Sequence, residues 1–242
     1  MIIRKPSPEE LPRLSLLWQE AFDESPEDVE IFYETAFSCD RALIVWEQNP
    51  VAGIYWIDAQ IADQKVAYLY AFAVGKNCRS KGIGKALLRQ TLETLKGEGY
   101  KAAVLVPGEE SLYSYYEKAG FTAFGKMEKI TVEEKAPGLP VEKISPDAYF
   151  AKRQELAPAV TWGEEAVSYL GKLCDLYAGN DWLLAIGREG VQEFIGNAQD
   201  LPHILYTLNM EKISVLAPGE KPCAMANCFA KIPLPDTFCP SF

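Results

Sequence analysis

The sequence predicts an α/β fold in two parts, and three observations indicate it. Segments with strand and helix patterns alternate along the first 134 residues. The stretch KAPGLP at 135–140 has the proline and glycine content of a linker. Short stretches of the second half resemble the first half in the same order. We therefore expect a larger domain over residues 1–134 and a smaller one over 140–242.

The first part begins with a strand at 1–4 and two helices. Ser7 is followed by Pro8 and Glu10, a capping-box pattern, and Ser25-Pro26 starts a second helix. The following segments predict, in order, a hairpin with strands at 42–46 and 51–57, a strand at 66–74, a helix bearing Leu88, Leu92 and Leu95, a buried strand at 101–106, a short helix at 111–119 and one or two strands at 121–132.

Three short matches relate the two halves. Residues 5–8 resemble 143–146 at an offset of 138, 40–43 resemble 181–184 at 141, and 104–109 resemble 215–220 at only 111. Their common order favours a duplication over chance, and the drop of 30 predicts that the second copy has lost a strand and the loop after it. We expect its helices near 145–156 and 202–208, and its strands near 182–187, 191–195, 213–216 and 224–230.

Charge narrows the possible partners. The chain has 24 Lys and Arg against 34 Asp and Glu, a net charge of −10. Such an acidic chain is a poor binder of the nucleic-acid backbone and suits a cationic substrate such as an amine. Because no apolar run approaches the ~18 residues of a membrane helix and the N-terminus turns polar early, we expect no membrane partner and a cytoplasmic location.

The cysteines predict neither disulfides nor a metal site. All six are scattered without a C-x-x-C pair, which is typical of reduced cysteines in a cytoplasmic protein. Cys223, Cys228 and Cys239 could in principle ligate a metal, but the single histidine, His203, gives no metal-ligand spacing. One histidine also disfavours a histidine-based nucleophilic triad. His203 lies in a helix-like stretch, where we expect a structural role.

The segment 74–88, between a predicted strand and a predicted helix, carries the chemistry. Gly82 and Gly84 remove side chains where a backbone must approach a ligand, and free N–H groups at the helix start favour an anion. Three cationic side chains add to this: Arg79, Lys81 and Lys85. The pattern predicts a diphosphate-binding loop, with a purely structural Gly-x-Gly turn as the alternative. It lacks the third glycine of a dinucleotide fingerprint and the spacing of a P-loop.

This loop resembles the pyrophosphate loop of the GNAT superfamily of N-acyltransferases. The superfamily pattern is Arg or Gln, two residues, Gly, one residue, and Gly or Ala, and the chain has Arg79-Ser80-Lys81-Gly82-Ile83-Gly84. Upstream, residues 71–74 resemble the strand before that loop, and downstream, 112–121 resemble the superfamily's "LYEKxGF" ending. The resemblance covers about the first 133 residues, with order and spacing preserved.

The resemblance implies a GNAT-like fold for the first part, a twisted mixed sheet flanked by helices that splays open after the loop-bearing strand. The internal matches then predict a second, smaller, partial and degenerate GNAT-like domain after it. The resemblance also implies acetyl-CoA as cosubstrate, without a metal, and a small-molecule or peptide amine as acceptor. The implied cofactor-binding residues are Phe72, Ala73, Val74, Arg79, Ser80, Lys81, Gly82, Ile83, Gly84 and Lys85. The second domain, which lacks the loop pattern, should bind no coenzyme A.

For catalysis, the resemblance implies an N-acetyltransferase in which the amine attacks the thioester directly. Tyr116 would protonate the leaving thiolate and the Val74 N–H would bind the carbonyl oxygen. A core aromatic is the alternative for Tyr116. The chain departs from the superfamily at Glu109, where an asparagine is frequent, and at Tyr68 and Tyr70, where some members place a glutamate. A second interpretation is a non-catalytic acyl-CoA sensor or pseudoenzyme, and a third is a purely structural fold.

Overall fold

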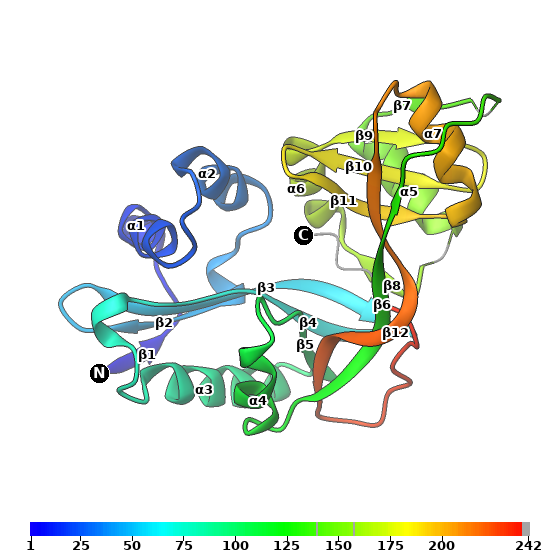
Figure 1. Ribbon diagram of the computed structural model, residues 1–242. Coiled ribbons are helices and arrows are strands. Elements are labelled where there is room, and N and C mark those ends of the chain that lie inside the picture. The colour runs from blue at the N-terminus through cyan, green and yellow to red at the C-terminus, as the bar shows by residue number, and fades with distance from the viewer. Residues whose placement is uncertain (139, 157, 239–242) are drawn as a thin grey trace. The chain divides into compact units, whose positions relative to one another are not determined.

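A computed structural model describes residues 1–138, 140–156 and 158–238 (Figure 1). Contacts within the chain define two compact units. The first comprises residues 1–123 and 225–233, and the second comprises 124–224 and 234–242. The first unit thus includes residues 225–233 from near the end of the chain, which the sequence did not indicate. The domain boundary expected at 135–140 stays a prediction, because contacts do not test independent folding.

The first unit is built on a mixed sheet. Its strands follow the order β1 (Ile2–Arg4), β2 (Ala42–Trp46), β3 (Pro50–Ile61), β4 (Gln64–Val74) and β5 (Ala102–Leu105). Neighbours are antiparallel except β4 and β5, which are parallel. The end of β12 (Ile213–Cys228) continues the sheet, because its last four residues pair with β5, and β6 (Thr122–Val132) follows β12. The mixed sheet expected from the sequence is confirmed.

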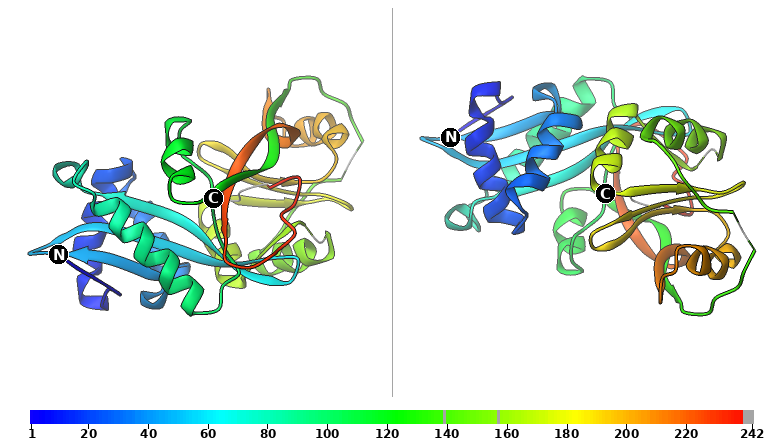
Figure 2. Two further views of the ribbon diagram at one scale, coloured as in Figure 1. Left: turned by 90° about the horizontal axis from the view of Figure 1, so that it is seen from below. Right: turned by 90° about the horizontal axis from the view of Figure 1, so that it is seen from above.

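Helices cover both faces of this sheet. α1 (Leu11–Phe22) and α2 (Pro26–Thr35) lie on one face and α3 (Ile83–Gly97) on the other (Figures 1 and 2). The N-cap of α2 is as predicted, since Ser25 Oγ accepts a hydrogen bond from the Asp28 N–H at 3.1 Å. Apolar side chains of α3 are buried against the sheet: Leu87, Leu88 and Leu95. The remaining elements are α4 (Ser111–Glu117) and the short 3₁₀ turns η1 (Pro8–Glu10), η2 (Cys39–Arg41) and η3 (Lys76–Cys78).

The second unit has its own antiparallel sheet. The strands lie in the order β7 (Glu142–Lys143), β9 (Asp175–Ala178), β10 (Leu183–Gly187) and β11 (Gly190–Ile195). The unit also contains α5 (Pro146–Leu156), β8 (Val160–Trp162), α6 (Glu164–Leu173), η4 (Ala198–Asp200), α7 (Leu201–Thr207) and the first part of β12. The expected helices and strands are present, although the last two strands are one long strand, β12. The sequence did not predict β7, β8, β9 or α6.

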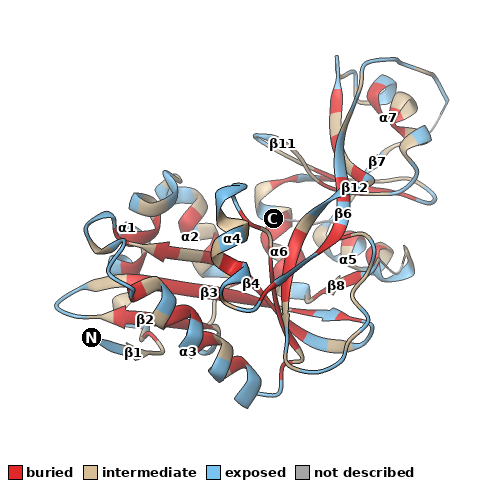
Figure 3. Ribbon diagram, turned by 60° about the horizontal axis from the view of Figure 1, so that its bottom comes forward, coloured by how far each residue is buried: buried red, intermediate tan, exposed pale blue. Residues whose placement is uncertain are grey.

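The small sheet is buried on both faces. Leu184 and Phe194 pack with the apolar side of α7, whereas Glu193, which points to the opposite face, accepts a hydrogen bond from Tyr149 of α5. Figure 3 shows buried residues in the strands of both sheets. The second unit therefore has a core of its own.

The two sheets share one order of elements. In each, a first strand is followed by two helices, three further strands, a helix and another strand, except that the short strand β8 lies between the two helices of the second unit. The sheet orders β1-β2-β3-β4 and β7-β9-β10-β11 correspond. β11 therefore holds the place of β4. The expectation that the second half lacks this strand needs correction, because β11 is present in shortened form. Whether the second unit is a degenerate GNAT-like domain stays a prediction.

Candidate active site

Strands β4 and β5 separate partway along β4. Their parallel pairing covers residues 66–68 of β4 and 102–104 of β5, while β4 continues to Val74 with β3 on its other side. The second half of β4 therefore has one edge that β5 does not cover. The splayed sheet expected from the sequence is confirmed.

A β-bulge marks the point of separation. Ala71 pairs with Tyr55 and Leu69 with Trp56, so Tyr70 is an extra residue on β4. Bulges increase local strand twist and end regular pairing, and they are frequent next to active sites. The bulge follows the last pair between β4 and β5 by two residues, which accounts for the splay at this position.

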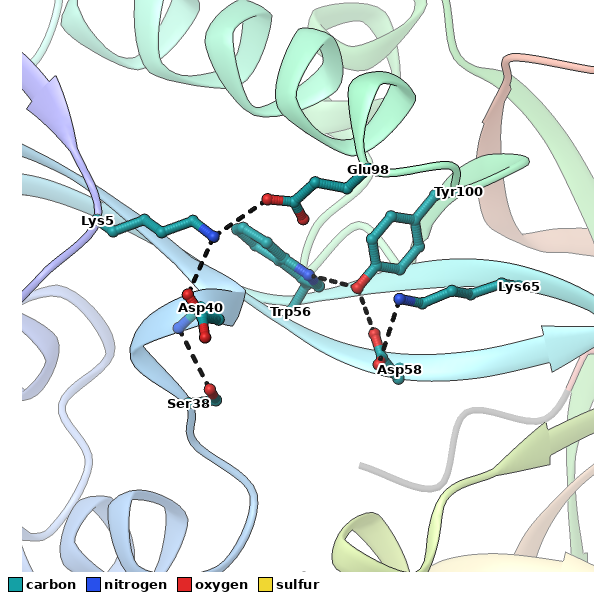
Figure 4. A network of polar contacts seen from close by, with 8 residues as sticks. All are labelled: Lys5, Ser38, Asp40, Trp56, Asp58, Lys65, Glu98 and Tyr100. Atoms are coloured by element: carbon teal, nitrogen blue, oxygen red, sulfur yellow. Dashed lines mark hydrogen bonds and ion pairs between the residues drawn. The ribbon is translucent and has the colours of Figure 1, made fainter.

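A polar cluster lies at the half of β4 that pairs with β5 (Figure 4). The Trp56 indole N–H donates to the Tyr100 hydroxyl at 3.2 Å, and Tyr100 donates to Asp58. The Lys65 ammonium lies 3.7 Å from the Asp58 carboxylate and 4.0 Å above the Tyr100 ring. Because Tyr100 precedes β5 and its partners belong to β3, these bonds cross β4 and hold the paired half together. Burial, with the hydrogen bond to Asp58, raises the pKa of Tyr100 well above its usual range.

The hydrogen-bond pattern of β4 identifies the groups on the open edge. The Gly75 N–H donates to the Val51 carbonyl at 3.0 Å, and Ala52 is in register with Val74. In an antiparallel pair, hydrogen-bonded and non-hydrogen-bonded positions alternate. The N–H and C=O groups of Phe72 and Val74 therefore point to the open edge, whereas those of Ala73 face β3. In agreement, the Val74 carbonyl accepts a hydrogen bond from Arg79 Nε at 3.0 Å.

The predicted loop joins this edge to α3. The first helical hydrogen bond runs from the Ala86 N–H to the Gly82 carbonyl at 3.0 Å, so the N–H groups of residues 83–85 lie outside the helical pattern. Gly82 has a φ of +79°, which favours glycine, and Ser80 has 63°. The loop cations are exposed: Arg79, Lys81 and Lys85. An exposed, cationic helix start of this kind is suited to an anion.

Gly84 lies where three elements meet. A Cβ atom at this residue would lie 3.3 Å from Val74 Cγ2 and 3.4 Å from both Phe72 Cζ and Tyr115 Oη. The end of β4, the start of α3 and α4 are thus in contact at one point. A larger residue here would push the helix start away from the strand.

Two adjacent tyrosines of α4 face different surroundings. Tyr116, the predicted acid, is 8% exposed, and its ring lies 5.5 Å from that of Phe121. Burial raises the pKa of Tyr116 well above its usual range. Tyr115 instead places its hydroxyl beside Gly84, and burial raises its pKa as well. Tyr115 was not predicted from the sequence as a site residue. Because neighbours on a helix point about 100° apart, it and Tyr116 face different surroundings.

The opposite face of β4 carries an aromatic cluster. Tyr70 packs against Phe32 of α2, with ring centroids 5.2 Å apart, and Trp18 of α1 lies 5.0 Å from Tyr55. The Tyr33 and Tyr55 hydroxyls are 3.3 Å apart, and burial raises the pKa of Tyr33 to about 12. Phenols and indole thus surround the position at which some superfamily members place a glutamate.

The remaining predicted features concern metal binding, membrane spans, the cysteines, His203 and Glu109. Within the described residues there is no group of three or more potential metal ligands among His, Cys, Asp and Glu, and no helix with the length and apolarity of a membrane span. Five cysteines are free thiols, and Cys239 and the C-terminal Phe242 lie outside the described residues. His203 is half-buried in α7, with Nδ1 3.1 Å from the Pro137 carbonyl. Glu109 is exposed and accepts a hydrogen bond from Ser111 at 2.6 Å.

Comparison with known proteins agrees with the geometry. The model of the acetyltransferase (GNAT) family matches residues 11–121, which include the open half of β4, the loop and α4. These residues form a GNAT acetyltransferase-family domain. No curated protein sequence matches the chain significantly.

Solved structures extend the similarity of fold beyond the GNAT domain. A GCN5-related N-acetyltransferase from Anabaena variabilis aligns over 93% of this chain and 72% of its own, with a TM-score of 0.71 and 16% identity. A second, from Kribbella flavida, aligns over 93% of this chain and 71% of its own, with a TM-score of 0.66 and 13% identity. A protein from Pyrococcus horikoshii aligns over 94% of this chain and 89% of its own, with a TM-score of 0.69 and 15% identity. The fold of the second unit is therefore also shared with other proteins.

Proposed function

We propose that the first unit transfers an acetyl group from acetyl-CoA to a primary amine. One observation carries this proposal: the open edge of β4 runs directly into a glycine-rich cationic loop at the start of α3. An extended chain with amide groups, such as pantetheine, can pair with a free strand edge, and a pyrophosphate can accept hydrogen bonds from a helix start. The two features lie in the order in which acetyl-CoA presents these groups.

The cofactor contacts follow from this arrangement. The backbone groups of Phe72 would pair with pantetheine, the Val74 N–H would face the acetyl carbonyl, and Ala73 would hold the strand to β3. The pyrophosphate would occupy the segment 79–85, where Gly82 and Gly84 leave room for it. Arg79 and the two loop lysines would balance its charge. Coenzyme A would thus bind mainly through backbone groups.

The chemistry needs two groups near the thioester. The Val74 N–H, on the open edge, would stabilise the negative charge that develops on the carbonyl oxygen. Tyr116 would give a proton to the leaving thiolate, since a phenol is protonated at neutral pH. Tyr115, whose hydroxyl is beside Gly84, is the matched comparison on the same helix.

An amine acceptor fits the charge of the first unit. The segment 20–34 of α1 and α2 is rich in Asp and Glu, and these helices cover the face of β4 that bears Tyr70. Negative charge attracts a protonated amine, and aromatic rings can contact a cation. Before attack the amine must lose a proton to a base or to water.

The test is turnover of acetyl-CoA with a panel of amines, followed by thiol release and by the mass of the acceptor. We expect thiol release that depends on the amine, with acetylated product. A sensor or pseudoenzyme would bind acetyl-CoA without releasing thiol. Failure to bind acetyl-CoA would leave the purely structural fold and refute both.

A further inference from the structure

The second unit contains a pocket of about 220 Å³ that the acetyltransfer reaction does not use. It lies between the end of β11, at Phe194–Gly196, and the middle of β12, at Leu216–Pro218. Met127 and Val160 complete its mainly apolar wall, and Arg153 and Glu193 bring the only charges among the described residues that line it. An apolar cavity of 150 Å³ can hold benzene, so this one can hold a ring with a short substituent.

A buried ion pair forms the polar part of the wall. The side chains of Arg153 and Glu193 are 2% and 0% exposed. Arg153 Nε lies 3.2 Å from both Glu193 oxygens, Nη2 lies 3.0 Å from one of them, and Nη1 donates to the Val160 carbonyl at 2.9 Å. Tyr149 donates to Glu193 at 2.8 Å. A buried ion pair is often no more stabilising than apolar residues of similar size. Stability alone therefore does not explain this pair, and we consider a role in binding.

The guanidinium has donors to spare. It carries five N–H groups, and the bonds to Glu193 and Val160 use the Nε–H and one N–H on each terminal nitrogen. One N–H on each terminal nitrogen has no acceptor among the residues that the structure describes. Because a buried donor without a partner costs stability, these groups favour an occupant that can accept a hydrogen bond.

The position of the pocket in the fold separates it from a coenzyme A site. β11 holds the place of β4 in the order of elements, so the pocket adjoins the strand end that corresponds to the open edge of the first unit. However, α7 has seven residues and is preceded by Asp200, and the loop before it has no Gly-x-Gly pattern. These features do not suit a pyrophosphate.

Charge selects the class of occupant. The positive charge of Arg153 and the negative charge of Glu193 cancel within the wall. A carboxylate or an ammonium would leave a net charge in a mostly apolar space, which is costly. A neutral carbonyl group satisfies the spare N–H donors without adding charge.

We propose that this pocket binds a small uncharged molecule with an apolar body and a carbonyl group held by Arg153. The proposal goes beyond acetyl transfer and does not depend on it. Benzamide is the probe, toluene is its match without a hydrogen-bond acceptor, and benzoate is its match with a charge.

The experiment measures binding of the three probes to the full chain by ligand-observed and amide-detected NMR. Benzamide should bind in the millimolar range or tighter, and toluene and benzoate should each bind about tenfold more weakly. The Ala217→Phe variant, which fills the pocket, should lose benzamide binding. Glu220→Phe adds the same bulk at an exposed residue of β12 outside the pocket and should leave binding unchanged.

A double variant tests the donor group itself. Arg153→Met with Glu193→Leu removes both charges and keeps side-chain bulk, so the unit should stay folded. Its preference for benzamide over toluene should disappear. No benzamide binding to the wild-type chain, a preference for benzoate, or a preference for benzamide that survives in the double variant would overturn the proposal.

Discussion

The two units repeat one order of strands and helices but differ in the lengths of those elements. α3 has fifteen residues and α7 seven, and β3 and β4 have twelve and eleven residues where β10 and β11 have five and six. The long elements of the first unit extend β4 past the end of its pairing with β5. In the second unit β11 is also an edge strand, but the helix that follows it is short and the loop between them lacks the Gly-x-Gly pattern and the three cations.

The difference shows what the proposed cofactor site requires. A helix start can favour an anion in any α/β fold, but only the first unit combines it with an open strand edge, glycines and three cations. In the corresponding region the second unit has a mostly apolar pocket with a neutralised ion pair. The same order of elements thus places a cationic loop after β4 in the first unit and a mostly apolar pocket beside β11 in the second.

The largest expected effect comes from Gly84→Glu. The side chain would meet Val74, Phe72 and Tyr115, and its carboxylate would repel the pyrophosphate, so acetyl-CoA binding should fall below detection by calorimetry. Gly97→Glu is the matched control, since the same helix has open space at Gly97. Unchanged affinity in a folded Gly84→Glu protein would refute the loop assignment.

Arg153→Ala should have the next largest effect, in the second unit. It leaves the Glu193 carboxylate buried without its cation, which should lower the free energy of unfolding by about 3–5 kcal/mol in urea titrations. As a control, Lys143→Ala removes an exposed ion pair with Asp175 and should leave stability nearly unchanged. Equal stability of Arg153→Ala and the wild type would mean that the pair is not buried in solution.

Tyr116→Phe tests the proposed acid and keeps the ring. Turnover should fall about 10²-fold while acetyl-CoA affinity is retained. Tyr115→Phe, the comparison on the same helix, removes a hydroxyl beside Gly84 and should have the smaller effect on turnover. The reverse ranking would move the acid to Tyr115, and wild-type turnover in both variants would leave them as packing residues.

The smallest effect is a pH dependence of stability in the first unit. Burial raises the pKa of Tyr33 to about 12 and that of Tyr55 well above its usual value, while both are near ~10 in an unfolded chain. Above about pH 10 the unfolded chain loses protons that the folded chain keeps, so the free energy of unfolding should fall as pH rises and stay level below. The Tyr33→Phe and Tyr55→Phe double variant should flatten this fall in urea titrations, and an unaltered slope would contradict it.

Most elements could be predicted because their signals are local. The Ser25-Pro26 start of α2, the leucine spacing of α3 and the apolar run of β5 depend on neighbours in sequence. The pairing of β12 with β5 could not be predicted, because it joins residues more than a hundred positions apart. The short strands β8 and β9 carry too few residues for a periodic pattern.

The loop was predictable for the same reason, since its glycines and cations are contiguous. The bulge at Tyr70 was not, because it depends on the register between β3 and β4 rather than on either strand alone. The buried partners Arg153 and Glu193 are forty residues apart and have no motif. A site that is built from packing is therefore found only in the fold.

The most direct test of the contrast between the units is the stoichiometry of acetyl-CoA binding to the full chain by isothermal titration calorimetry. The account predicts one equivalent per chain, because only in the first unit does a cationic, glycine-rich loop follow the open strand edge. Two equivalents would show that the second unit also holds the cofactor. No binding would show that the open edge of β4 is not a coenzyme A site.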